Sequence, residues 1–232
     1  MARLLEHVDA QVVRDRLDAA RTRIAAACER AGRSPGEIEL LAATKYVPVE
    51  MMGALRDAGV KLVGENTAQD LIAKQERWGD AFTWDFIGHL QSRKAKLVLP
   101  RVRLIHSLES ESVLERIERL AEAPVRVLLE VNVSGEESKY GVPAEGVDEF
   151  VERASRSELV VLAGLMTMPP FAASPEDARP HFARLRELAQ RLRRDWAPRH
   201  EFSVLSMGTS QDFEVAVEEG ATICRLGGVL YG

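Results

Sequence analysis

The sequence predicts an α/β fold, a single (β/α)8 barrel of the TIM type, and three observations lead to this class. Eight short runs rich in Val, Ile, Leu and Ala alternate with segments of helical periodicity along the 232 residues. No internal repeat or Pro/Gly-rich linker divides the chain, so residues 1–232 are expected to form one domain. Polar residues follow the apolar runs, as at the carboxyl-end sites of such barrels. An open, doubly wound sheet is the alternative architecture.

The predicted strands are short, and helix-like segments fill the intervals between them. The strands cover residues 38–45, 61–66, 83–89, 103–109, 126–133, 159–168, 203–208 and 222–228. An extra amphipathic helix over residues 6–31, ended by Gly32, precedes the first strand. On the fifth strand, period-two alternation turns Glu130 and Asn132 toward the barrel interior and the apolar residues between them toward the helices.

The composition narrows the classes of partner. A formal net charge of −5 with interleaved acids and bases argues against a nucleic-acid partner. The two cysteines, Cys28 and Cys224, are too sparse for a disulfide framework or a metal site. No apolar run reaches the length of a signal peptide or a membrane span. We therefore expect a cytoplasmic protein without a metal or a membrane partner, and we expect a monomer.

Lys45 is the first candidate for chemistry, because it closes the apolar run IELLAATK and Pro48 soon follows it. A lysine at the carboxyl end of a buried strand faces either water or a ligand. Desolvation there lowers the amine pKa and favours the neutral nucleophile that Schiff-base chemistry needs. A solvated strand-end lysine without a chemical role is the alternative interpretation.

Other polar or small residues close the remaining strands, so the barrel places them at the same mouth as Lys45. In chain order they are Asn66, His89, His106 with Ser107, Asn132, Met166, Ser206 with Gly208, and Arg225 with Gly227 and Gly228. Each residue alone is better explained by a structural role than by a ligand. Their shared position at one rim is the stronger signal.

The last two strands predict a phosphate site. The segment LSMGTSQDF turns from strand to helix at Thr209 and Ser210, where free backbone N–H groups attract anions. A helix cap on Thr209 or Ser210, with Asp212 in a capping box, is the alternative. The next strand ends in Arg225, Gly227 and Gly228, and barrels frequently bind phosphate between these two loops.

A phosphate site and a strand-one lysine in one mouth imply a phosphorylated carbonyl compound. Pyridoxal 5′-phosphate (PLP) is the economical candidate, since its aldehyde would react with Lys45 while its phosphate lies near Ser210 and the Gly227–Gly228 pair. Sugar-phosphate aldolases without a cofactor meet the same two constraints, but their reactive lysine typically lies on a later strand.

Eight ordered motifs carry a family resemblance over nearly the whole chain. They are ATKYVP, GENTAQDLIAK, WDFIGHLQSRKAK, IHSLES, LLEVNVSGEESKYGV, GLMTMPP, LSMGTSQDFEVAVEEG and RLGGVLYG. Together they resemble the pyridoxal phosphate homeostasis protein family, of the YggS/PROSC type. The resemblance implies a barrel similar to the N-terminal domain of alanine racemase, with PLP covalently bound to Lys45.

The resemblance also implies roles for the other site residues. Asn66 would lie near the cofactor ring, Ser210 and the backbone of Gly227 and Gly228 at the phosphate, and Arg225 at either the phosphate or the pyridine nitrogen. The implied function is intracellular PLP homeostasis, in which the protein holds and buffers the cofactor or delivers it to PLP-dependent apoenzymes. Gly228 departs from the family pattern, which usually has a phosphate-binding Thr or Ser there.

A PLP-dependent amino-acid racemase is the alternative function. A pyridine nitrogen that faces arginine stays unprotonated, which weakens the electron sink that racemisation requires. The chain ends at Gly232, without room for the second domain that supplies the opposing tyrosine of alanine racemase. We therefore expect cofactor binding without efficient turnover.

Overall fold

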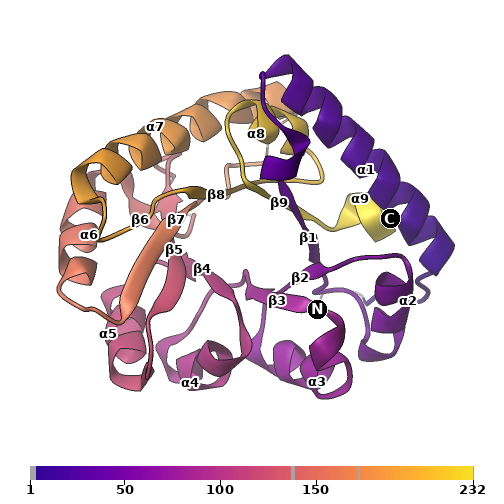
Figure 1. Cartoon of the computed structure of the whole chain (residues 1–232), viewed down its shortest axis with the longest axis horizontal. Coiled ribbons are helices and arrows are strands. Elements are labelled where there is room, and N and C mark those ends of the chain that lie inside the picture. The colour runs from indigo at the N-terminus through magenta and orange to yellow at the C-terminus, as the bar shows by residue number, and fades with distance from the viewer. Residues whose placement is uncertain (1–3, 137–138, 172, 232) are drawn as a thin grey trace.

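Eight parallel strands close into a barrel in the computed structural model, which describes residues 4–136, 139–171 and 173–231 (Figure 1). The strands are β1 (Glu39–Ala43), β2 (Leu62–Glu65), β3 (Thr83–Phe86), β4 (Leu104–Leu108), β5 (Val125–Asn132), β7 (Val160–Met166), β8 (Val204–Thr209) and β9 (Ile223–Leu226). Pairing of β1 with β9 and of β4 with β5 closes the ring. The predicted barrel is confirmed, and the open sheet is wrong because each of these eight strands has two neighbours. A short strand, β6 (Val142–Pro143), pairs with β5 outside the ring.

Helices surround the strands as an outer layer (Figure 1). The α-helices are α1 (Ala10–Arg30), α2 (Met52–Asp57), α3 (Ala68–Trp78), α4 (Ala95–Val98), α5 (Glu111–Leu120), α6 (Val147–Ser155), α7 (Arg179–Trp196), α8 (Phe213–Glu218) and α9 (Gly228–Tyr231). The helix predicted over residues 92–99 is only one α-helical turn, α4, between the 3₁₀ turns η4 (Ser92–Lys94) and η5 (Leu99–Arg101). Pro100 in η5 cannot donate the backbone hydrogen bond that a longer α-helix needs.

The extra N-terminal helix is confirmed, and it packs on the outside of the ring against α2, α8 and α9 (Figure 1). It begins at Ala10 instead of residue 6, because the Asp9 carboxylate accepts the N–H groups of Gln11 and Val12 as an N-cap. It ends at Arg30, and Gly32 follows with a φ of +65°, as expected of a glycine that terminates a helix.

Two apolar layers build the core. The larger layer lies between the strands and the helices and contains Leu129, Val131 and Val133, as the alternation predicted. The smaller layer fills the barrel interior and consists of Leu41, Leu62, Leu104, Leu128, Ala163, Met166 and Ile223. A separate set of buried polar side chains on neighbouring strands includes Asp85, His106 and Ser206, so the barrel interior is only partly apolar.

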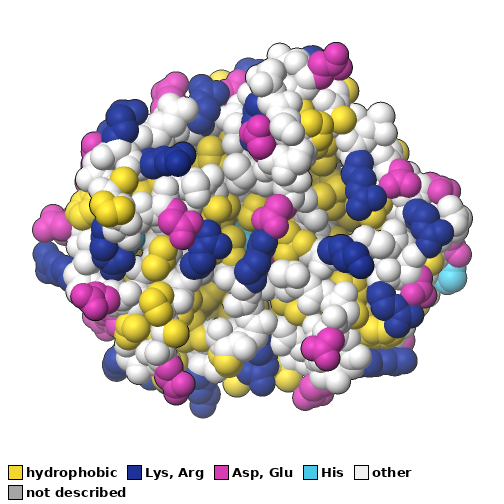
Figure 2. Space-filling model, viewed as in Figure 1, with side chains coloured by type: hydrophobic (Ala, Val, Ile, Leu, Met, Phe, Trp, Pro, Cys, Tyr) yellow, Lys and Arg dark blue, Asp and Glu magenta, His cyan; other side chains and the backbone are white. Residues whose placement is uncertain are grey.

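The surface matches the mixed charge of the sequence. Figure 2 shows acidic and basic side chains interspersed over one face, with apolar surface between them and no basic stripe across it. Within the described part of the chain, no helix is long and apolar enough to cross a membrane.

Candidate functional site

The carboxyl ends of the strands surround a cavity of about 420 Å³. All six residues predicted to bind the cofactor line it: Lys45, Asn66, Ser210, Arg225, Gly227 and Gly228. Ala43, Ile87, Met166 and Met168 supply apolar walls, and Glu130 adds a carboxyl group. Residues from seven strand ends and loops, far apart in the sequence, therefore share one concave site at the end of the barrel where such folds carry their chemistry.

Lys45 follows β1 and is separated from it only by Thr44, which is fully buried. The Thr44 N–H donates to the Gly64 carbonyl at 3.0 Å and so continues the β1–β2 pairing up to the lysine. The Lys45 side chain is exposed, so the desolvation that the sequence predicted for its amine is not found. Its Nζ lies 4.7 Å from the centroid of the Tyr46 ring, a cation–π contact at the rim.

A buried charge cluster fixes the backbone immediately before Lys45. Lys74 on α3 donates to the Thr44 carbonyl at 2.7 Å and forms an ion pair with Glu65, and the Thr44 hydroxyl donates to the same carboxylate. Lys74 and Glu65 are 3% and 0% exposed. Burial raises the pKa of Glu65, against the opposing charge of Lys74. This cluster was not predicted from the sequence. The one feature that pointed to it was the carboxylate of Glu65 in the otherwise apolar strand β2.

The loops after β8 and β9 meet at Ser210. Its Oγ accepts the backbone N–H groups of Gly227 and Val229, both at 3.1 Å. These two donors converge on one oxygen, which is the arrangement that a phosphate oxygen would also satisfy. A Cβ built on Gly228 would have only the Ser210 Oγ within 4 Å, at 4.0 Å, so the backbone here borders open space.

The alternative prediction, that Thr209 or Ser210 caps the next helix in a capping box with Asp212, is wrong. The Asp212 carboxylate accepts the Thr209 N–H, and also its hydroxyl at 3.1 Å, but α8 begins only at Phe213, with Asp212 itself at the N-cap position. Ser210 is therefore not a helix cap. Its Oγ instead faces the β9–α9 turn, the other side of the predicted phosphate site.

Arg225 points into the barrel and is only 6% exposed. Its Nη1 donates to the Ser206 Oγ at 2.6 Å, and its Nη2 donates to the Thr167 carbonyl at 2.9 Å and to the Met168 Sδ at 2.8 Å. Among the described residues, no hydrogen bond joins Arg225 to Ser210. Burial lowers the pKa of the Arg225 guanidinium from its usual value. Its two Nη atoms are thus engaged with β8 and with the end of β7.

Asn66 and Glu130 complete the walls. The Asn66 Oδ1 is buried and has no hydrogen-bond partner among the described residues, which leaves an acceptor for a ligand at the cavity. A Cβ on Gly88 would lie 2.0 Å from the Asn66 carbonyl oxygen, so only glycine permits this close approach. Glu130 is 6% exposed and faces the cavity as predicted. Burial and the neighbouring Glu109 raise its pKa to about 7, while Arg225 acts in the opposite direction.

Four residues predicted at the rim lie elsewhere. His106 and Ser107 are buried inside β4, which continues to Leu108, so both lie below the mouth. Ser206 is buried in β8 and bonds to His106. Asn132 does not point inward, because its amide donates to the Glu136 carbonyl at 2.8 Å and organises the loop after β5.

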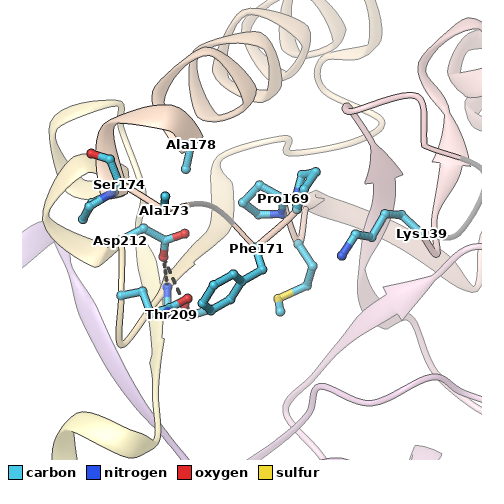
Figure 3. A pocket seen from close by; sticks show the side chains of 12 residues that line it. Lys139, Pro169, Phe171, Ala173, Ser174, Ala178, Thr209 and Asp212 are labelled. Atoms are coloured by element: carbon cyan, nitrogen blue, oxygen red, sulfur yellow. Dashed lines mark hydrogen bonds between the residues drawn. The ribbon is translucent and has the colours of Figure 1, made fainter.

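A second hollow of about 420 Å³ adjoins the cavity and shares Met168 and Thr209 with it. Figure 3 shows Lys139 and Asp212 on opposite sides of this hollow, with Phe171 and Pro169 between them. Phe171 is 81% exposed, and Asp212 is already bonded to Thr209. The hollow therefore widens the mouth with mostly apolar surface.

The barrel and its site define a class: the alanine racemase N-terminal domain, whose family model matches residues 16–232. The pyridoxal phosphate homeostasis protein of Aquifex aeolicus (strain VF5) is 44% identical over 224 residues, which cover 94% of this chain and 96% of that relative. The chain belongs to the family of pyridoxal phosphate homeostasis proteins.

Two solved structures of similar length agree with this assignment. A protein from Bifidobacterium adolescentis has a TM-score of 0.90 at 34% identity and covers 99% of this chain and 98% of its own. PipY from Synechococcus elongatus PCC7942, solved with PLP bound, has a TM-score of 0.82 at 30% identity, with coverage of 95% of this chain and 100% of PipY.

Proposed function

We propose that this protein binds PLP through a Schiff base on Lys45 and holds the cofactor for cellular PLP homeostasis. One observation carries the proposal: the Lys45 amine and the Ser210–Gly227 donors line the same cavity. The names of the relatives and the PLP bound to PipY support the choice of ligand.

The residues of the cavity fit the cofactor in size and chemistry. The Ser210 hydroxyl offers a donor for a phosphate, and the Gly227 and Val229 N–H groups, which donate to its Oγ, hold it in place. Asn66 offers an unpaired acceptor, and the apolar walls suit an aromatic ring. Arg225 bonds to Ser206 and Thr167 and has no hydrogen bond to Ser210 among the described residues, which favours its role at the pyridine nitrogen over a role at the phosphate. The Nε–H and one Nη1–H of Arg225 then serve as donors to the ring.

PLP supplies an aldehyde, which condenses with an amine to an imine and water. Lys45 would supply the amine for this condensation, and its nitrogen would have to lose a proton to act as the nucleophile. The exposed side chain of Lys45 gives that proton access to solvent. The buried Lys74 holds the backbone that carries Lys45, although it lies too far under the cavity floor to line it.

The proposed physiological role is to bind a reactive aldehyde reversibly, so that it does not modify other amines. Delivery to PLP-dependent apoenzymes and a monomeric state remain predictions from the sequence. Two of the side chains that line the cavity, Tyr140 and Met168, are exposed, so the cavity borders solvent there.

The test of covalent binding compares the wild-type protein with Lys45→Ala and Lys45→Arg after addition of PLP. We expect the wild type to develop the imine absorption band, and borohydride reduction followed by peptide mass spectrometry to place one pyridoxyl group on Lys45. Lys45→Arg keeps the positive charge but lacks the nucleophile, so it should lose the band as fully as Lys45→Ala. Modification of another lysine in the wild type would contradict the proposal.

A further inference from the structure

A chain of hydrogen bonds runs through the barrel interior below the cavity. Arg225 donates to the Ser206 Oγ at 2.6 Å, and that hydroxyl lies 2.9 Å from the His106 Nδ1. The His106 Nε2 lies 3.1 Å from the Asp85 Oδ2, and Arg103 donates two hydrogen bonds to Asp85 at 3.0 and 2.7 Å. Asp85, His106 and Ser206 are each 0% exposed. The chain joins the cavity wall to the base of the barrel, since Arg103 precedes β4.

The chemistry of the two ends fixes the direction of every bond between them. Arg225 can only donate, so the Ser206 oxygen accepts from it and its own proton stays available for His106. Two hydrogen bonds from Arg103 keep Asp85 ionised, and the pKa of Asp85 is lowered by His106 and Arg103 in spite of burial. Asp85 therefore accepts from the His106 Nε2–H, and the Nδ1 of a neutral imidazole accepts from Ser206.

The opposite tautomer of His106 does not fit. With a proton on Nδ1, the Ser206 oxygen would accept from both His106 and Arg225, and the Ser206 proton would lose the imidazole as its acceptor. The unprotonated Nε2 would face the Asp85 carboxylate. Burial lowers the pKa of His106 as well, and Arg225 and Arg103 act in the same direction while Asp85 opposes them. A single protonation pattern thus holds across the network.

Stability alone does not account for this network. Three buried polar side chains inside a barrel carry a desolvation penalty that an apolar layer avoids. The same barrel has such a layer in Leu41, Leu104 and their neighbours. The polar network ends on Arg225, a cavity-lining guanidinium that keeps N–H groups beyond those it donates to Ser206, Thr167 and Met168.

We propose that His106 is a positioning residue: through Ser206 it orients the Arg225 guanidinium toward the ring of the bound cofactor, and Asp85 fixes its tautomer. The proposal rests on the proposed function, because it assigns Arg225 to the ring of PLP. His106 itself does not line the cavity, so it acts only through Ser206 and Arg225. Its role is to keep one donor in place for the pyridine nitrogen, which stays unprotonated.

The experiment substitutes His106→Asn and compares it with His200→Asn. His200 is the matched control, because it is also buried, at 1% exposure, and its ring bonds to the Ser155 hydroxyl at 2.8 Å, far from the cavity lining. We expect His106→Asn to weaken PLP binding about tenfold and to shift the absorption band and its pH titration. His200→Asn should change neither property, even if both variants lose similar thermal stability.

A double-mutant cycle separates positioning from a general loss of structure. If His106 acts through Arg225, then His106→Asn should have no further effect on affinity or band position in an Arg225→Gln background. Equal effects of His106→Asn in both backgrounds would overturn the proposal. Where His106→Asn does not fold, Ser206→Ala interrupts the same chain by the loss of one hydroxyl and should show the same coupling.

A measurement without cofactor keeps this proposal apart from the proposed function. Nitrogen-15 NMR of the wild-type imidazoles at pH 7 should show His106 neutral and as the Nε2–H tautomer. A protonated His106 or the Nδ1–H tautomer would overturn the network whether or not PLP binds. Failure of the wild type to form the Lys45 adduct, with the NMR result as expected, would instead contradict the proposed function.

Discussion

The two ends of the barrel differ in how completely their polar groups are paired. At the amino end, Arg103 bridges Glu39 and Asp85, and Arg126 pairs with Glu201 through two hydrogen bonds of 3.2 and 2.6 Å. The carboxyl end instead leaves groups available, and several large apolar side chains are exposed around it: Tyr46, Tyr140, Met168 and Phe171. The charged groups at the amino end are paired with one another, whereas some polar groups at the mouth are not. This difference indicates that the amino end maintains the fold while the carboxyl end is suited to a ligand.

Two phenylalanines, one in the core and one beside the mouth, give the largest expected effect. Phe182 on α7 is 0% exposed in the main core, whereas Phe171 beside the mouth is 81% exposed. Phe182→Ala should lower the free energy of unfolding by about 3–5 kcal/mol, because it leaves a cavity in the core. Phe171→Ala should change it by less than about 0.5 kcal/mol.

Denaturant unfolding of the two variants measures both values, and the PLP absorption band reports on the site. Phe182→Ala should keep the band wherever the protein remains folded, since Phe182 lies outside the cavity lining. A comparable loss of stability in both variants would show that the mouth contributes to the core, and the division between the two ends would fail.

The next prediction concerns Glu130, whose carboxyl group is buried at the mouth. The charge of Arg225 offsets only part of the cost of burying its ionised form. Its pKa is raised to about 7, so between about pH 4.5 and 7 the folded chain keeps a proton that the unfolded chain has released. Stability should therefore fall as the pH rises through this window, by about 3 kcal/mol in total from this group. Glu130→Gln removes the titration and should be more stable than the wild type at pH 8 but similar to it at pH 4.5.

Urea unfolding of both proteins at several pH values between 4.5 and 8 tests this sign. Glu149→Gln is the control, because Glu149 is exposed on α6 and its substitution should leave the pH profile of the wild type unchanged. If the free energy of unfolding of the wild type and of Glu130→Gln depended on pH in the same way, Glu130 would ionise normally. Its burial at the mouth would then not destabilise the fold at high pH.

The sequence predicted the barrel well because parallel buried strands leave short, contiguous apolar runs. The strand ends were less accurate: the run 159–168 contains β7 (Val160–Met166), and the run 83–89 contains β3 (Thr83–Phe86). The apolar pattern does not mark the residue at which pairing stops. This uncertainty of two or three residues explains the error at His106, which pairs within β4 two residues before Leu108 and so lies one layer below the mouth.

Active sites of such barrels lie at the carboxyl ends of the strands, and this rule predicted that the six site residues share one cavity. The groups that support the site could not be predicted in this way. Glu65 and Lys74 belong to a strand and a helix, and their ion pair has no periodic signal in the sequence. Asp85 and Ser206 lie 121 residues apart and are linked only through His106. Periodicity predicts which face a side chain takes, but partners across the barrel depend on register and depth, which only the fold specifies.

The smallest expected effect is a gain in affinity for PLP from a substitution at the mouth. Gly228 lacks the hydroxyl that the family pattern usually has, and a Cβ there would meet only the Ser210 Oγ at 4.0 Å. Gly228→Ser should therefore fit without strain and add one hydrogen bond to the phosphate, which corresponds to about 1 kcal/mol or a roughly fivefold lower Kd for PLP. Gly79→Ser is the control for the loss of a glycine, because a Cβ at Gly79 meets nothing within 4 Å and Gly79 is not part of the cavity. Titration of PLP into both variants and the wild type should show the lowest Kd for Gly228→Ser. Equal affinities would mean that the backbone N–H groups of Gly227 and Val229 already satisfy the phosphate. The polar groups at the mouth would then match the ligand more completely than their pairing in this structure suggests.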